Sequence, residues 1–281
     1  MAQSLNIVWI TGAGGLIGSH IAQAAPTDWT VRALQHAELD LTDFPATRTA
    51  FQRDAPKLII HCAALSSIAA CDADPKLAWR TNVEASRHLA ELASDMPLFF
   101  FSTDLVFDGR QGHYAEDDAD HPLTSYAESK VAAEQAVLAN PRHTVIRTAL
   151  TVGRSPRGDR ACNEQLELAW KRGETTRLFV DEFRSPIPAE VTARAIWELV
   201  AAGGSGLFHL GGSERVSRFA LGQLIAERCP QLQPRLEPAY IRDSSDPRRP
   251  PDTSLDVRKI QELLSFPLPC ISEWLRRPTP P

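Results

Sequence analysis

Apolar runs of strand length alternate with amphipathic segments of helix length through the first half of the chain. Continuous apolar runs such as KLIIHCAA and PLFFFS are typical of strands that are buried on both faces of a parallel sheet. The pattern predicts strands at 5–10, 30–34, 57–62, 97–102 and 143–148, and helices at 16–25, 45–54, 75–94 and 125–139. We therefore expect an α/β fold with a doubly wound parallel sheet.

After about residue 150 the pattern becomes irregular and richer in proline and arginine. We expect residues 1–150 to form the sheet domain, with 176–203 returning to it. Residues 151–175 and 204–281 are expected to form a smaller C-terminal substrate-binding lobe. Ligands of such sheets bind at the carboxyl ends of the strands, so the residues that follow each strand are candidates for a site.

A glycine-rich turn follows the first predicted strand. In LNIVWITGAGGLIG an apolar run is followed by glycines at 12, 15 and 18, and then by a helix start. Glycines there let the backbone turn tightly and approach a pyrophosphate, which the N–H groups of the helix N-terminus bind. A merely flexible turn is the alternative, but the strand before it and the helix after it favour a Rossmann-type dinucleotide-binding fold.

Tyr126 and Lys130 are four residues apart in the predicted helix TSYAESKVAAEQ. Positions i and i+4 share a helix face, so the phenol and the ammonium can point into one site. A cation beside a phenol lowers its pKa from about 10 and makes the tyrosine a usable general acid or base. The spacing is also common on solvated helices, and it is the glycine turn that favours a catalytic pair.

Charge and cysteine content exclude several classes of protein. The net charge of −5 over 281 residues and the lack of a basic stripe argue against a nucleic-acid binder. No apolar run reaches the ~18 residues of a membrane span, so we expect a cytoplasmic protein without a membrane partner. Neither a disulfide framework nor a metal site is expected, because no Cys-x-x-Cys or histidine ligand spacing occurs.

Taken in order, these motifs resemble the extended short-chain dehydrogenases/reductases, and among them the dTDP-4-dehydrorhamnose reductase family. The supporting segments are ITGAGGLIG, LDLTD at 39–43, IIHCAA at 59–64, TNVEASRHLAELA at 81–93, STDLVFDG at 102–109, YAEDDADHPLTSYAESKVAAE at 114–134, VIRTALTVG at 145–153, FVDEFRSPIPAEVTARAI at 179–196 and RRPPDTSLDVRKIQELL at 248–264. Leu105 departs from the family, which usually has an aromatic residue there.

The resemblance implies reduction of a keto group on a nucleotide-linked deoxysugar, with dTDP-4-dehydrorhamnose as the best single guess. Tyr126 would donate a proton to the keto oxygen as hydride arrives, and Lys130 would hold the nicotinamide ribose and depress the Tyr126 pKa. Thr103 would hydrogen-bond the same oxygen, unless it is an ordinary strand-end hydroxyl. Asp104 is followed by leucine and not by glutamate, which disfavours the water elimination of related 4,6-dehydratases.

The resemblance also implies a nicotinamide cofactor. Arg32 and His36 near the second strand favour NADPH over NADH, although Glu38 could bind the ribose hydroxyls of NADH. Asn82 could instead only support the backbone. The residues expected to bind the cofactor are Gly12, Gly15, Leu16, Ile17, Gly18, Asp40, Leu41, Cys62, Ala63, Ala64, Asn82, Tyr126 and Lys130.

A nucleotide-sugar diphosphate favours arginine ligands, whose planar fork matches phosphate oxygens. Such arginines are equally often solvated surface residues. The residues expected to contact the substrate are Thr103, Asp104, Leu150, Arg184 and Arg249, with Arg248 and Val152 as neighbours.

Three alternatives stay open. An epimerase of the same fold would use the same tyrosine and lysine but retain its nicotinamide tightly. A reductase of another deoxysugar would share every motif. A regulatory subunit, such as the methionine adenosyltransferase β-subunit, would bind the cofactor without turnover. A homodimer is also left open.

Overall fold

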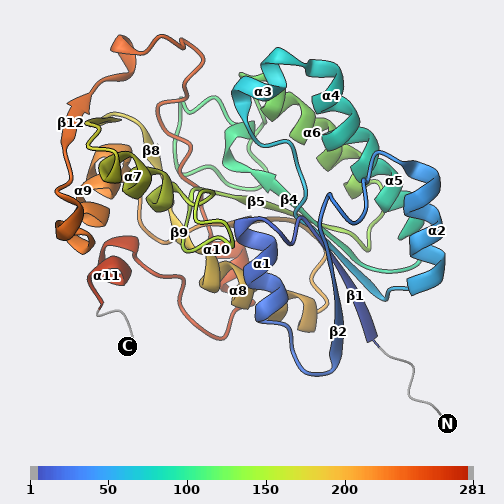
Figure 1. Ribbon diagram of the computed structural model, residues 1–281. Helices are drawn as coiled ribbons and strands as arrows, with labels where there is room; N and C mark the ends of the chain where they lie inside the picture. Colours follow the sequence, from blue (N-terminus) through green and yellow to red (C-terminus); the bar gives the residue numbers. More distant parts are fainter. Residues whose placement is uncertain (1–5, 278–281) are drawn as a thin grey trace.

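A parallel six-stranded sheet lies at the centre of the computed structural model, which describes residues 6–277 (Figure 1). The strand order is β10-β5-β4-β3-β1-β2, and every neighbouring pair is parallel. The strands are β1 (Asn6–Thr11), β2 (Trp29–Leu34), β3 (Leu58–His61), β4 (Leu98–Thr103), β5 (Thr144–Thr148) and β10 (Gly206–Leu210). The α/β fold and its five predicted strands are confirmed; Leu5, predicted to open the first strand, lies outside the described residues.

Helices cover both faces of this sheet (Figure 1). They are α1 (Leu16–Gln23), α2 (Phe44–Asp54), α5 (Ala85–Leu92), α6 (Ser125–Leu138) and α8 (Ala189–Ala201). Successive side chains of a strand point to opposite faces. Val8 and Ile10 of β1 therefore pack with α1 and α8, whereas Trp9 of β1 and Phe100 of β4 pack with α2, α5 and α6.

The helix predicted over 75–94 forms as three consecutive segments. These are α4 (Pro75–Trp79), a single π-helical turn (Arg80–Glu84) and α5. A separate short helix, α3 (Ile68–Ala73), precedes them. A π turn is rare and frequently lies at a functional site. Here it contains Asn82, a residue expected to lie near the cofactor.

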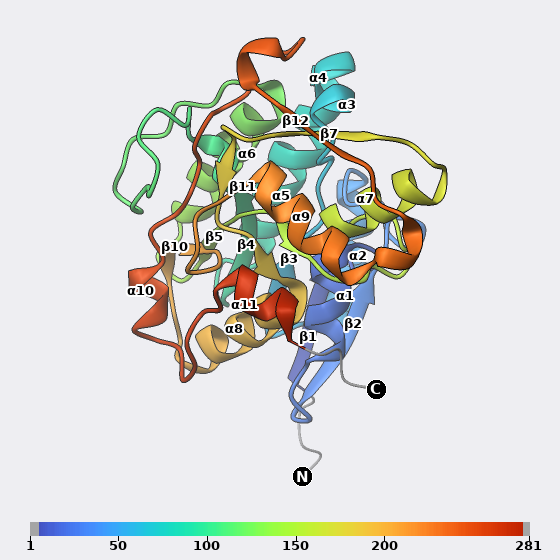
Figure 2. The same cartoon turned by 90° about the vertical axis from the view of Figure 1, so that its left-hand side faces the viewer.

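The second half of the chain builds a further group of short elements, seen from the front in Figure 2. They are β6 (Thr151–Val152), α7 (Cys162–Lys171), β7 (Thr176–Phe179), β8 (Phe183–Arg184), β9 (Ile187–Pro188), β11 (Val216–Ser217), α9 (Arg218–Arg228), η3 (Pro230–Leu232), β12 (Leu236–Ala239), η4 (Ile241–Asp243), α10 (Arg258–Gln261) and α11 (Ile271–Arg276). Apolar side chains of β6, α7, β11, α9 and α11, among them Val152, Trp170 and Ile271, form a separate core cluster. Ile187 of β9 and Ile260 of α10 instead pack into the core of the sheet.

Residues after 150 also return to the central sheet. Helix α8 packs against α1, and β10 forms the edge strand beside β5, within the segment 204–281 that was expected to belong to the smaller lobe. The division of the chain into two domains stays a prediction. No helix in the described range 6–277 is long and apolar enough to cross a membrane.

Candidate active site

The glycine turn between β1 and α1 is tightly packed. Gly12 has a φ of +67°, and a Cβ there would lie 2.7 Å from the backbone nitrogen of Ala63. The Gly15 N–H donates to the Gly12 oxygen at 2.8 Å, and a Cβ on Gly18 would lie 2.5 Å from that oxygen. Side chains at 12 and 18 would therefore displace the turn that brings α1 to the end of β1.

Four other residues expected around the cofactor lie near this turn or along the next loop. Leu16 is buried against α8, and Ile17 packs partly into the sheet core. Asp40 is exposed and accepts hydrogen bonds from the Thr42 N–H and hydroxyl at 2.9 and 2.8 Å, which hold its pKa below the usual range. Leu41 packs partly against the core on the other face of the sheet.

Arg32, His36 and Glu38 are the residues considered for the adenosine ribose of the cofactor. Arg32 pairs through Nε with Asp54, the last residue of α2, at 3.2 Å, and 46% of its side chain remains exposed. His36 remains exposed at the end of β2, beside Gln35. The Glu38 carboxylate accepts from the Gln35 N–H at 3.1 Å. Both Arg32 and His36 are thus exposed near β2, and their contact with a ribose phosphate stays a prediction.

A buried chain of polar groups runs from the glycine turn to the π turn. The Thr11 hydroxyl lies 2.7 Å from His61 Nδ1, and His61 Nε2 lies 3.0 Å from the Ser86 hydroxyl. Ser86 in turn donates to the backbone carbonyl oxygen of Asn82 at 2.6 Å, and the Ala63 N–H donates to Thr11 Oγ1 at 3.2 Å. These bonds fix the ends of β1 and β3 relative to each other.

Asn82 extends the chain to the helix that carries the tyrosine. Its side chain donates to the Ser129 hydroxyl at 2.9 Å, and it exchanges two hydrogen bonds with the backbone of Leu65. Ser129 donates to the backbone carbonyl oxygen of Tyr126 at 2.7 Å. The structure thus shows Asn82 supporting the backbone, while its contact with a cofactor stays a prediction.

Tyr126 and Lys130 are both buried on α6, which begins at the capping residue Thr124. The ring of Tyr126 packs beside Cys71, and Lys130 Nζ lies 3.9 Å from the centroid of the Phe100 ring. The charge of Lys130 acts on both His61 and Cys62, so α6 places the ammonium against the end of β3.

The pKa shifts of this pair differ from the expected ones. Burial raises the pKa of Tyr126 to about 12, although a hydrogen bond with Thr103 opposes this shift. Burial lowers the pKa of Lys130 to about 7. The expected depression of the tyrosine pKa by Lys130 is therefore wrong for this structure, because the loss of solvation dominates. A tyrosine that is protonated at neutral pH is nonetheless the form that a proton donor needs.

Thr103 ends β4, and Asp104 opens the 3₁₀ turn η2 (Asp104–Val106). The Thr103 hydroxyl donates to Asp104 Oδ1 at 3.3 Å and accepts from the Leu105 N–H at 3.2 Å. Asp104 has no exposed surface, and its carboxylate accepts hydrogen bonds from both Nε and Nη2 of Arg184. Burial alone would lower the pKa of Arg184, but the charge of Asp104 and its hydrogen bonds hold this pKa above its usual range.

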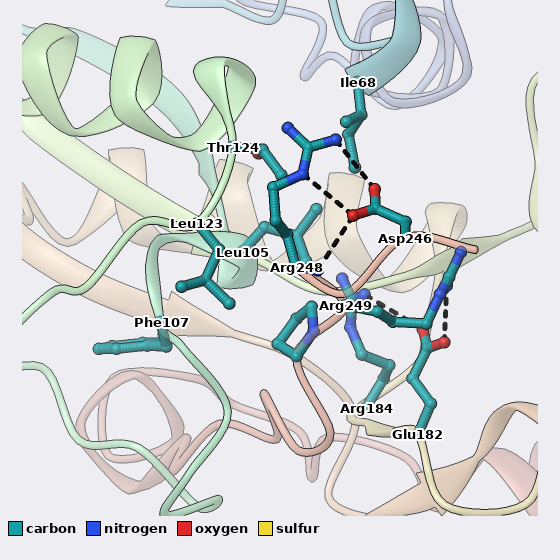
Figure 3. A pocket seen from close by; sticks show the side chains of 11 residues that line it. Ile68, Leu105, Phe107, Leu123, Thr124, Glu182, Arg184, Asp246, Arg248 and Arg249 are labelled. Atoms are coloured by element: carbon teal, nitrogen blue, oxygen red, sulfur yellow. Dashed lines mark hydrogen bonds and ion pairs between the residues drawn. The ribbon is translucent and has the colours of Figure 1, made fainter. Parts of the chain in front are cut away.

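A pocket beside the N-terminus of α6 is lined by two of the five expected substrate residues, Arg184 and Arg249, and by their expected neighbour Arg248 (Figure 3). Arg249 donates to the Glu182 carboxylate at 2.7 Å, while Arg248 is exposed and pairs with acidic side chains including Asp246. The residues around this pocket are Ile68, Leu105, Phe107, Leu123, Thr124, Glu182, Arg184, Asp246, Arg248, Arg249 and Pro250. Three arginines therefore line one cavity, and the planar guanidinium fork suits phosphate oxygens.

The remaining expected residues have less prominent positions. Cys62, Ala63 and Ala64 follow β3 and are half-buried, and burial raises the pKa of the Cys62 thiol well above its usual range. Leu150 packs against the core of the second group of elements, and Val152 is fully buried within it. Neither of these two belongs to the pocket described above, and the sugar contact expected of Leu150 stays a prediction.

Residues 6–277 match the family model of the RmlD substrate binding domain. The chain belongs to this family. The resemblance inferred from the motifs is thereby confirmed.

Named relatives agree with this assignment. The chain is 31% identical over 276 residues to a dTDP-4-dehydrorhamnose reductase of Mycobacterium tuberculosis, covering 94% of this chain and 88% of the relative. It is 29% identical over 293 residues to a probable low-salt glycan biosynthesis reductase, Agl14, of Haloferax volcanii, covering 95% of each. A solved dTDP-4-dehydrorhamnose reductase of Bacillus anthracis in complex with NADP has a TM-score of 0.88, with 23% identity and coverage of 97% and 98%. At that identity the likeness establishes the shared fold.

Sequence reasoning missed three polar residues of this RmlD-family site. His61 and Ser86 bridge the glycine turn and the π turn, and Glu182 lies buried between the pocket arginines. A histidine at the end of an otherwise apolar strand was the available signal for His61. Glu182 has no such signal, because its partners come from distant segments.

Proposed function

We propose that this RmlD-family protein is an NADPH-dependent oxidoreductase that reduces the 4-keto group of a dTDP-linked deoxysugar, with dTDP-4-dehydrorhamnose as its substrate. The observation that carries this proposal is the burial of Tyr126 and Lys130 one turn apart on α6, with the Thr103 hydroxyl at the end of β4 acting on the phenol. The relatives named dTDP-4-dehydrorhamnose reductase support the substrate, and the neighbour bound to NADP supports the cofactor. The expected cytoplasmic location belongs to this proposal.

The glycine turn fits a dinucleotide. A Cβ on Gly15 would meet only the Gly12 oxygen, at 3.1 Å, and among the described residues no side chain caps the start of α1. The first N–H groups of this helix are therefore open to a pyrophosphate. The residues proposed to hold the cofactor are Gly12, Gly15, Leu16, Ile17, Gly18, Asp40, Leu41, Cys62, Ala63, Ala64, Asn82, Tyr126 and Lys130.

When bound, the reduced nicotinamide supplies a hydride to the carbonyl carbon of the sugar. Tyr126 donates its phenolic proton to the carbonyl oxygen, and the Thr103 hydroxyl donates a hydrogen bond to the same oxygen. This bond stabilises the negative charge that develops there. Lys130 binds the ribose hydroxyls of the cofactor and stabilises the phenolate that Tyr126 leaves behind. Arg249 is proposed to bind the diphosphate.

The direct test mixes the purified protein with NADPH, or separately NADH, and a panel of nucleotide-linked 4-ketosugars. Loss of the reduced-nicotinamide absorbance with dTDP-4-dehydrorhamnose, and formation of dTDP-rhamnose, is the expected result. An epimerase would interconvert sugars with no net consumption of added cofactor. A regulatory subunit would bind NADPH, consume none with any sugar, and copurify with an enzyme. Either of these results would overturn the proposal.

Replacing Lys130 with alanine is expected to weaken NADPH binding by at least ~10-fold as well as to slow turnover, because hydrogen bonds to a charged group are lost. Titration of the reduced-nicotinamide fluorescence measures the affinity. Lys76→Ala, at an exposed position of α4, is the control and should bind NADPH like the parent protein. An unchanged affinity in Lys130→Ala would remove this lysine from the cofactor site.

A further inference from the structure

Asp104 is a buried carboxylate that separate segments of the chain hold in place. Arg184 on β8 donates from Nε to Oδ2 at 2.6 Å and from Nη2 to Oδ1. The Thr253 hydroxyl lies 3.3 Å from Oδ2, and the Thr103 hydroxyl lies 3.3 Å from Oδ1. Asp104 is 0% exposed and Arg184 only 7% exposed. Almost the whole accepting capacity of this carboxylate is therefore used within the protein.

This pairing is difficult to reconcile with a phosphate ligand role for Arg184. Only Nη1 is left over, and it lies 3.9 Å from the Glu182 carboxylate. To bind phosphate with Nε and Nη2, Arg184 would have to release Asp104. The charge of Asp104 would then be buried without a partner, which is strongly unfavourable. Arg249 is better suited, because it faces the pocket and its Nε has no hydrogen-bond partner among the described residues.

The same carboxylate competes for the proton of Thr103. A threonine hydroxyl has a single proton to donate. Thr103 Oγ1 already accepts a hydrogen bond from the Leu105 N–H. The hydroxyl proton of Thr103 is directed to Asp104 Oδ1, and the Oγ1–Oδ1 distance of 3.3 Å is long for a hydrogen bond between oxygens. A bare carboxylate would hold this proton firmly, whereas one bound by a guanidinium is a weaker acceptor.

We infer that Arg184 is a positioning residue for the proposed reduction: by orienting and neutralising Asp104, it leaves the Thr103 proton free for the keto oxygen beside Tyr126. The inference rests on the proposed function. It assigns to Arg184 a role in turnover and not in binding the diphosphate.

The experiment compares Arg184→Met, Arg184→Lys, Asp104→Asn and the double variant Asp104→Asn/Arg184→Met in the NADPH assay. Arg184→Met is expected to lower kcat by at least ~10-fold and to change KM for the nucleotide-sugar by less than about 3-fold. Arg184→Lys, which keeps the charge but not the fork, should retain more activity than Arg184→Met. The double variant removes both charges and should recover most of the lost kcat.

Binding of dTDP to the cofactor-free protein, measured by calorimetry, gives a readout that does not depend on turnover. The affinity of Arg184→Met for dTDP is expected to stay within about 3-fold of the parent value, whereas Arg249→Met should weaken it by ~10-fold or more. Arg215→Met is the matched control, since Arg215 pairs with Asp252 and stacks on Phe183 without touching Asp104.

The outcomes separate the two proposals. If the parent protein neither consumes NADPH with any sugar nor binds dTDP, the proposed function fails, and the role of Arg184 fails with it. If the parent is active but Arg184→Met raises KM and weakens dTDP binding, Arg184 is a phosphate ligand and only the present inference is overturned. Failure of the double variant to recover kcat, although it is folded, would also overturn it, because removing the Asp104 charge should make Arg184 dispensable.

Discussion

Replacing Tyr126 with phenylalanine is expected to lower kcat by at least ~100-fold, the scale on which a general acid contributes, while NADPH still binds. The tyrosine is 9% exposed and its ring packs beside Cys71, so phenylalanine fills the same space and leaves no cavity. What is lost is the proton that neutralises the developing alkoxide. The measurement is steady-state turnover of the nucleotide-sugar together with a fluorescence titration of NADPH.

Tyr114→Phe is a matched control for this prediction. Tyr114 is also buried, its hydroxyl donates to Asp108 at 2.9 Å, and its ring stacks on Phe107. Its loss should reduce stability slightly and leave kcat within a few-fold of the parent value. If Tyr126→Phe instead turns over like Tyr114→Phe, another group delivers the proton, and the assignment of Tyr126 is wrong.

Local patterns were sufficient to predict five of the six sheet strands and the glycine turn, but not the edge strand β10. A buried strand needs a continuous apolar run, and a turn with a positive φ at Gly12 needs glycine, so both features are visible in a few adjacent residues. The i,i+4 spacing likewise placed Tyr126 and Lys130 on one helix face. The arrangement of the catalytic candidates thus followed from short-range rules and from the resemblance.

Features that depend on distant segments could not be predicted. Asp104 and Arg184 are 80 positions apart in the chain, and nothing in either local segment indicates that they pair. The rise of the Tyr126 pKa has the same origin, because burial by packed segments decides it and the spacing to Lys130 does not. The pairing of Arg32 with Asp54, the last residue of α2, likewise joins positions 22 apart that no local pattern connects.

The second large effect expected is a loss of stability in acid that depends on His61. This ring is 1% exposed between Thr11 and Ser86, and burial, together with the charge of Lys130, lowers its pKa to about 3. In the unfolded chain a histidine takes up its proton near pH ~6.5. Between these two values only the unfolded state binds the proton, so the free energy of unfolding must rise with pH and fall as acid is added.

The expected slope from this one group is about 1.4 kcal/mol per pH unit, or on the order of 3 kcal/mol between pH ~6.5 and ~4. Replacing His61 with glutamine removes the titrating group, so denaturant unfolding of this variant should show a pH slope smaller by that amount in the same window. Loss of the His61 hydrogen bonds would lower the free energy of unfolding by the same amount at every pH and leave its pH slope unaffected.

His121→Gln, at an exposed position, is the control and should keep the pH slope of the parent protein. Equal slopes in the parent and His61→Gln would mean that His61 binds its proton as readily in the folded chain as in the unfolded one, and that the buried chain from Thr11 to Asn82 opens in acid before the protein unfolds.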